Sequence, residues 1–209
     1  MLSDSSFFNS SLNRYKRYRS VGMELNDKIM KSKMSKELIE RAARILGMSH
    51  NGQLIFDSKD EMNILMDFGL YEASLGGKTA VQLYQEEQGG SNKIEQELLI
   101  AMAEAKTSLF FVERVNKSNC QMELQELVAE KRRLTLTDIG FSQTLKNKVI
   151  VFFRPIELAD FVMTSGVTFA FPGNLEKELV NKWKKWSQDE YYPGFFRLNK
   201  SKGISIRYE

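Results

Sequence analysis

Apolar residues recur at helical spacing through the first half of the chain. Between residues 35 and 47, Leu38 and Ala42 lie one turn apart on a shared face. Ser35 can cap the start of this helix, and Gly47 can end it. The same spacing, each time behind a capping residue, predicts three more helices, at residues 58–73, 79–87 and 92–106.

The pattern changes at Thr107. Five short segments follow that are rich in β-branched and aromatic residues and partly alternate in polarity: SLFFVERV, QMELQELV, RLTLTDI, KVIVFFRPI and DFVMTSGVTFAF. The connections between them are short and mostly polar, which predicts an antiparallel meander curled into a small barrel or half-barrel. Helical spacing returns over residues 173–186, where Leu175, Leu179 and Trp183 share one apolar sector.

These patterns predict an α+β fold with a helical N-terminal half, a small five-stranded antiparallel barrel and a C-terminal helix. Residues 1–20 keep no apolar period, so we expect them to be poorly ordered, and residues 24–34 fit either a short helix or a linker. We expect a flexible basic segment at 1–33, a helical region at 34–106, a β region at 107–172 and a C-terminal helix with an aromatic, basic tail at 173–209. Residues 34–186 should form one compact unit.

Composition is that of a globular protein. Of 209 residues, 42% are apolar, which is enough to build a sizeable core. No apolar run approaches the roughly 18 residues needed to cross a bilayer. The basic residues near the N-terminus follow Phe7 and Phe8, the reverse of the order in a secretory signal, and Cys120 is the single cysteine. We therefore expect a soluble, cytoplasmic protein with no membrane partner.

The segment SLGGKTAVQLY resembles the end of a nucleotide-binding P-loop. In that motif the first glycine stands five residues before the second, and here this position is Glu72, whose carboxylate would repel a phosphate. A P-loop also follows a buried strand, whereas this segment follows a predicted helix. We therefore expect Gly76 and Gly77 to end one helix, Thr79 to cap the next, and Lys78 to face solvent or a carboxylate.

Other catalytic constellations find little support in the sequence. His50 and Cys120 are alone of their kinds, so His/Cys zinc sites cannot assemble within one chain, and no zinc is expected. Asp57, Asp60 and Glu61 lie close together, but acidic residues at the start of a helix are better explained by capping than by Mg²⁺ binding. We expect no cofactor, no metal and no enzymatic activity; a carboxylate- and metal-dependent enzyme is the remaining alternative.

Positive charge is concentrated at the two ends of the chain. Residues 1–33 hold seven Lys and Arg against three Asp and Glu, while residues 34–172 are slightly acidic. The candidate contacts for nucleic acid or an acidic partner are Arg14, Lys16, Arg17, Arg19, Lys131, Arg132 and Arg133. In the first four, the interleaved Tyr15 and Tyr18 offer faces for base stacking. Ordinary solvation of basic ends is the competing explanation.

Aromatic residues beyond the last predicted helix need a place to bury. These are Tyr191, Tyr192, Phe195 and Phe196. Aromatic side chains anchor protein interfaces, so we expect this tail to contact a partner protein or a second copy of the chain. Weak alternation over residues 204–208 fits an added edge strand, a docking tail or a disordered end.

From Phe68 to Pro172 the chain resembles the domain that precedes the cysteine-rich SEC-C motif in many bacterial proteins of unknown function. The resemblance rests on MDFGLYEASLGGKTAVQLYQEE, EQELLIAMAEAKTSLFFVERVN, LQELVAEKRRLTLTD, SQTLKNKVIVFFRPIE and SGVTFAFP. It implies an adaptor domain with no recognised catalytic residues. Proteins of that family commonly end in a zinc-binding segment with paired cysteines, whereas residues 173–209 contain no cysteine and no histidine.

Together these observations favour a non-enzymatic protein-interaction or adaptor module. The first alternative is a nucleic-acid-binding accessory protein that uses the basic terminal segments. The second is the carboxylate- and metal-dependent enzyme.

Overall fold

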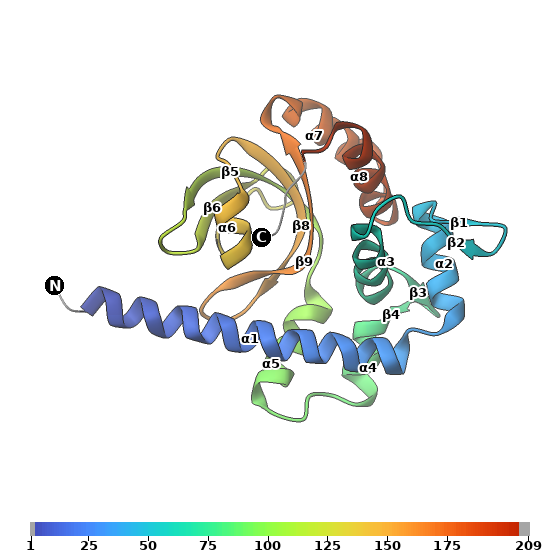
Figure 1. The fold of residues 1–209 in the computed structure, drawn as a ribbon, viewed down its shortest axis with the longest axis horizontal. Helices are drawn as coiled ribbons and strands as arrows, with labels where there is room; N and C mark the ends of the chain where they lie inside the picture. The colour runs from blue at the N-terminus through green and yellow to red at the C-terminus, as the bar shows by residue number, and fades with distance from the viewer. Residues whose placement is uncertain (1–2, 205–209) are drawn as a thin grey trace.

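The computed structural model describes residues 3–204 (Figure 1). A small barrel lies beside a group of helices, and one long helix runs beneath both. The elements before the barrel are α1 (Ser3–Lys33), α2 (Lys36–Leu46), β1 (Ser49–His50), β2 (Gln53–Leu54), α3 (Asp60–Tyr71), β3 (Ser74–Leu75), β4 (Lys78–Thr79), α4 (Ala80–Glu87) and α5 (Lys93–Glu104). The remaining elements are β5 (Ser108–Asn116), β6 (Gln121–Glu126), β7 (Arg133–Thr137), α6 (Ile139–Thr144), β8 (Val149–Glu157), β9 (Val162–Pro172), the 3₁₀ turn η1 (Gly173–Leu175), α7 (Glu176–Lys185) and α8 (Gln188–Lys202).

Three of the four helix caps expected from the sequence are present. Ser35 accepts a hydrogen bond from the Leu38 amide, and Gly47 ends α2 in the left-handed conformation. Thr79 forms a complete capping box at the start of α4, and Asn92 caps α5. At α3 the arrangement differs, because no side chain caps the helix at its N-cap position. Local hydrogen-bonding capacity therefore sets most of these helix starts.

The five predicted strands are confirmed, but the prediction that they are all antiparallel is wrong. They close into a barrel in the order β5-β6-β7-β9-β8, in which β7 pairs with β9 in parallel at Leu136 and Val162. The reason is α6, which occupies the predicted connection FSQTLKN. It carries the chain across the barrel, so that β8 pairs with β5 and β9 returns between β8 and β7. This order, with a helix between the third and fourth strands, is that of an OB-fold.

Two apolar clusters hold the molecule together. The first fills the barrel with inward side chains of the strands, and Phe141 and Leu145 from the α6 region pack into it. The second is larger and lies outside the barrel, where Phe152 and Phe169 meet the helices. Strand β8 is therefore buried on both faces, and only the side of the barrel formed by β5, β6 and β7 keeps exposed outward side chains.

The N-terminal segment differs from expectation. Residues 1–20 were expected to be poorly ordered, yet α1 is one continuous helix of 31 residues. Tyr15, Tyr18, Leu25 and Ile29 are buried along one side of it, at steps of three, seven and four residues. Because these apolar residues pack on α4, α5 and the barrel, tertiary contacts stabilise a helix whose local propensity is poor.

The C-terminal tail also differs from expectation. Residues 188–202 form α8, in which Tyr192, Phe195 and Phe196 are buried against the barrel. Phe195 lies 4.6 Å from Phe152, ring centre to ring centre. Ile204 then bridges to Ala170 of β9, and the rest of the predicted edge strand lies outside the described residues.

One buried ion cluster joins the helices to the barrel. Arg154 of β8 is 1% exposed, donates to Asp67 at 2.9 Å and also pairs with Glu72. Its guanidinium lies 4.3 Å from the centre of the Tyr71 ring. Burial disfavours the charged form, but the two carboxylates nevertheless raise the pKa of Arg154 above its ordinary value. This cluster therefore fixes α3 to the barrel.

Candidate functional site

The Gly-Lys-Thr segment is a short hairpin. Gly76 and Gly77 link β3 to β4 with positive φ angles of 68° and 86°, which suit a two-residue turn. Lys78 pairs with Glu86 at 2.6 Å, a carboxylate partner of the kind expected. Glu72, which stands in the place of the first P-loop glycine, is part of the buried ion cluster. Each residue of this segment that matches part of the P-loop motif therefore has a structural role in the fold.

The residues considered for metal or nucleophilic chemistry lie apart. Within the described part of the chain, no group of three or more His, Cys, Asp or Glu side chains is arranged to hold a metal ion. His50 is exposed on β1, and Cys120 is buried at the turn before β6. Of the three clustered acids, Glu61 accepts a hydrogen bond from the Asp57 amide at 2.8 Å and pairs with Lys200.

The outer face of β5, β6 and β7 is polar and balanced in charge. Arg114 pairs with Glu123 at 4.0 Å, and Arg133 pairs with Glu113 at 3.0 Å across the strands. This is the face on which OB-folds bind oligonucleotides. Single-strand binding relies on excess positive charge and on exposed aromatic faces. These four charges cancel, so they give this face no net positive field.

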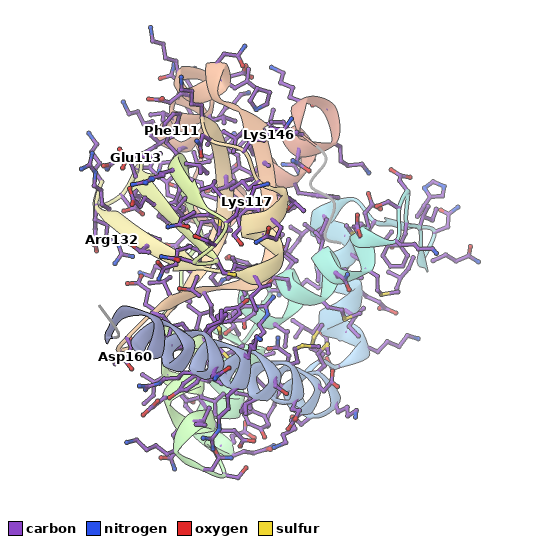
Figure 2. All side chains as sticks on the ribbon, turned by 60° about the vertical axis from the view of Figure 1, so that its left-hand side comes forward. Phe111, Glu113, Lys117, Arg132, Lys146 and Asp160 are labelled. Carbon is purple, nitrogen blue, oxygen red and sulfur yellow. The ribbon has the colours of Figure 1, made fainter. Side chains whose placement is uncertain are left out.

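The basic triplet at the β6–β7 hairpin is largely neutralised. Arg132 pairs with Glu157 through both terminal nitrogens and approaches Glu130 at 3.6 Å. Arg133 is held by Glu113, and Lys131 is exposed. Figure 2 shows Arg132 and Glu113 on the outer side of the barrel. Of the triplet, only Lys131 is left as a charge without a paired carboxylate in the described structure.

The aromatic residues proposed as partner contacts pack within the chain. Tyr192, Phe195 and Phe196 are each at most 3% exposed. Tyr191 is half-buried and stacks on Trp183 with ring centres 3.7 Å apart. They are core residues of the α7–α8 layer, so their side chains are not offered to a partner.

The four basic residues of the motif RYKRYR point in different directions. Arg14 pairs with Asp160 of the β8–β9 loop, which Figure 2 shows beside α1. Arg19 turns inward and donates to the Thr164 carbonyl at 2.6 Å. Lys16 and Arg17 are exposed. The helix therefore presents part of this motif to solvent and uses the rest for packing.

The two tyrosines of this motif are not stacking faces. The rings of Tyr15 and Tyr18 meet Phe161 edge to face, with centres 6.1 and 5.5 Å apart. Burial raises the pKa of Tyr15 to about 12. The Tyr18 hydroxyl donates to Glu97 of α5, and burial together with this hydrogen bond raises its pKa. Both side chains belong to the junction of α1 with the barrel and α5.

The open groove on the described surface that gathers basic residues lies between α1 and α5. It has a volume of about 400 Å³, and Arg14, Arg17 and Lys93 line it together with Asn13, Tyr18, Ile94 and Glu97. Arg14 and Arg17 lie one turn apart on α1, so they share a face. Lys93 begins α5, where the N-terminal end of the helix dipole is positive, although Asn92 already caps the Ile94 and Glu95 amides.

The charges in this groove favour an anionic ligand. Its acid, Glu97, already accepts the Tyr18 hydroxyl and lies 3.9 Å from Lys93. Arg17 has no ion pair among the described residues. The sequence indicates Arg14 and Arg17 but not Lys93, because nothing local shows that α1 and α5 pack side by side. The spacing of the two arginines, three residues apart, is the signal in the sequence that places both on one face of a helix.

A family model that describes a family of unknown function (DUF7986) matches residues 9–209. No curated protein and no solved structure matches the chain. The match gives no support to the resemblance to the SEC-C-associated domain. Within residues 3–204, no helix is both long enough and apolar enough to cross a membrane. The match spans nearly the whole chain, which therefore belongs to this family of unknown function.

Proposed function

We propose that the protein is a non-enzymatic interaction module that binds an acidic segment of another protein in the groove between α1 and α5. The observation that carries this proposal is the convergence of Arg14, Arg17 and Lys93 from two helices on one groove of about 400 Å³. A groove of this size accepts a few side chains of an extended peptide. Ile94 adds an apolar wall to the cationic rim.

An acidic peptide fits this groove better than a single-stranded nucleic acid. The aromatic ring that lines it, that of Tyr18, is 4% exposed and packs against Phe161, so it cannot stack on a base. Carboxylates need only charge and hydrogen-bond donors. Arg17 supplies both without an ion pair among the described residues, and Arg14 and Lys93, which already pair with Asp160 and Glu97, add further donors.

A nucleic-acid-binding accessory protein is the second candidate, because the barrel has the strand order of an OB-fold. Fold alone does not assign a ligand, however, and the usual binding face is neutral in charge. If the protein does bind nucleic acid, the groove between α1 and α5 would bind the phosphate backbone.

One titration separates the two candidates. Fluorescently labelled poly-glutamate and an oligo-dT of equal charge are titrated with the wild type, with Arg17→Glu/Lys93→Glu and with Lys184→Glu/Lys185→Glu. The last variant is the matched control, because α7 lies at the opposite end of the molecule from the groove (Figure 1). Reversing two groove charges should weaken poly-glutamate binding by roughly tenfold or more, whereas the control should bind as the wild type does.

The outcomes are distinct. Preference for poly-glutamate that is lost only in the groove variant supports the interaction module. Preference for oligo-dT with the same loss, and a steep decrease with salt, supports the nucleic-acid candidate instead. Equal loss in both variants, or no binding of either probe at low salt, contradicts both.

A further inference from the structure

A second, smaller pocket lies where α1, α3, α5 and the barrel meet. Its volume is about 70 Å³, room for about two water molecules at roughly 30 Å³ each. Arg19, Gly22 and Asn26 of α1 line one side, and Tyr71 of α3 and Ser165 of β9 line another. It shares no lining residue with the groove between α1 and α5.

The polar groups of this pocket do not satisfy one another. Asn26 Oδ1 and Ser165 Oγ are buried and have no hydrogen-bond partner among the described residues. Arg19 donates from Nη1 to the Thr164 carbonyl, which leaves its other N–H groups, and it has no ion pair within residues 3–204. Buried polar atoms are nearly always hydrogen bonded, to protein or to ordered water, so these groups need either water or a ligand in the pocket. Arg19 is half-buried at the edge of the pocket, so its charge would attract an anionic ligand in preference to water.

No described carboxylate forms an ion pair with Arg19, and the nearby Asp138 accepts hydrogen bonds from the Thr164 hydroxyl and the Phe141 amide. Asp67 and Glu72, the carboxylates around Tyr71, are both engaged by Arg154. Burial raises the pKa of the Tyr71 phenol, so its hydroxyl stays protonated and can donate. The pocket thus combines a guanidinium that has no ion pair among the described residues with the hydroxyls of Tyr71 and Ser165 and the amide of Asn26.

A glycine in the middle of a long helix opens this pocket. Gly22 lies in the interior of α1, where glycine costs roughly 0.5–1 kcal/mol relative to alanine. Packing does not require it, because an added Cβ would meet only the flexible end of Met163, at 3.9 Å. The missing side chain leaves space on the pocket wall. No contact excludes a side chain at position 22, so the pocket is the feature that explains the glycine.

We propose that this pocket binds a small oxyanion that also carries a hydroxyl group, of the size of hydrogen phosphate. Its anionic oxygens accept hydrogen bonds from Arg19 and Ser165, and its hydroxyl donates to Asn26 Oδ1. The volume excludes a nucleotide or a peptide. A small hydroxy acid such as glycolate offers the same groups, so phosphate and glycolate are the two sources to compare.

Thermal unfolding tests this site on the full chain. The melting temperature is measured in sodium phosphate, glycolate and acetate against sodium chloride of equal ionic strength. At ten times its Kd, the preferred anion should raise the melting temperature by about 3 °C. Glycolate should exceed acetate, which lacks the hydroxyl. The proposal would be overturned if neither phosphate nor glycolate raised the melting temperature.

Four variants show whether the anion acts in this pocket. Gly22→Ala should raise the melting temperature in chloride, through helix propensity, and lose the increase with the anion. Ser20→Ala, an exposed position on the same helix, should show a similar gain and keep the anion effect. Asn26→Asp keeps the shape of the side chain, repels the anion and should also lose the effect.

The fourth variant, Arg17→Gln, removes a cation from the groove and should keep the anion effect. Equal increases in the wild type, Gly22→Ala and Asn26→Asp would place the anion elsewhere and overturn the proposal. Loss of the increase in Arg17→Gln alone would place the anion in the groove between α1 and α5, and this result would also overturn the proposal. Because the tests of the two sites use different variants, either one can fail without the other.

Discussion

Arg154 shows how one residue can couple two parts of a fold. A guanidinium cannot lose its charge in a protein, so burial at this position requires negative partners. Asp67 and Glu72 provide them from α3 and the residue after it. Burial raises the pKa of Glu72 and Arg154 opposes that rise, so the carboxylate depends on the arginine for its charged state.

Replacing Arg154 with methionine should destabilise the protein by about 3–5 kcal/mol, because the substitution leaves Asp67 and Glu72 buried without their cation. Urea unfolding near neutral pH measures this loss. The loss should shrink as the pH falls, since protonation removes the unpaired charge.

Arg197→Met is the matched control for Arg154→Met. Arg197 is exposed on α8, and its substitution should change the free energy of unfolding by less than about 0.5 kcal/mol. A loss in Arg154→Met no larger than in this control would show that the buried cluster does not stabilise the fold.

Elements with strong local determinants could be predicted from the sequence. Ser35 and Gly47 bound α2, and Thr79 begins α4, because these residues satisfy free amides or adopt a left-handed conformation on their own. The five strands were found from their β-branched and aromatic runs. These features depend on a few neighbouring residues, so they can be predicted from a single sequence.

Elements that depend on distant partners could not be predicted in the same way. In α1 the apolar positions Tyr15, Tyr18, Leu25 and Ile29 follow helical spacing, but Gly22 and a run of basic residues interrupt it. The parallel pairing of β7 with β9 is decided by the path of the chain through α6. The groove needs α1 and α5 side by side, which no local pattern of either helix specifies.

Glu95 gives an element-scale prediction about pH. Its carboxylate accepts from Lys28 of α1 and from Ser91 before α5, and these hydrogen bonds lower its pKa from 4.5 to about 2. A carboxylate with a lowered folded-state pKa stabilises the protein above its unfolded-state pKa. The stability advantage of the wild type over Glu95→Gln should therefore be full above pH 4.5 and disappear as the pH falls toward about 2.

Chemical unfolding across this pH range measures that advantage, with Glu104→Gln as the control. Glu104 is exposed at the end of α5, so its variant should follow the pH profile of the wild type. An advantage of the wild type over Glu95→Gln that stays constant down to pH 2 would contradict the role assigned to Glu95.

At the scale of the whole molecule, the helices and the barrel share one apolar cluster. It includes Leu25 of α1, Leu65 of α3, Phe152 of β8 and Phe195 of α8, which come from both ends of the sequence. Because neither part can bury its apolar surface alone, we expect the two to unfold together.

Two probes test this cooperativity. Both tryptophans, Trp183 and Trp186, lie at α7, so their fluorescence reports on the C-terminal layer, whereas far-ultraviolet circular dichroism follows helices throughout the chain. The two denaturant transitions should coincide in midpoint and slope. A separate tryptophan transition at lower denaturant would show that α7 and α8 form an independent unit.

The proposed function depends on the groove, where Arg14, Arg17 and Lys93 meet. In the sequence its arginines belong to a longer basic motif, RYKRYR, whose tyrosines suggest base stacking. In the fold those tyrosines are buried in the junction, and the cationic groove is what remains open.

The most direct test is a map of backbone amide chemical shifts during titration with poly-glutamate. The proposed function predicts that the largest, saturable changes fall at residues 13–18 and 93–97, and that they vanish in Arg17→Glu/Lys93→Glu. Changes concentrated on β6 and β7, or scattered over the exposed lysines without saturation, would contradict it.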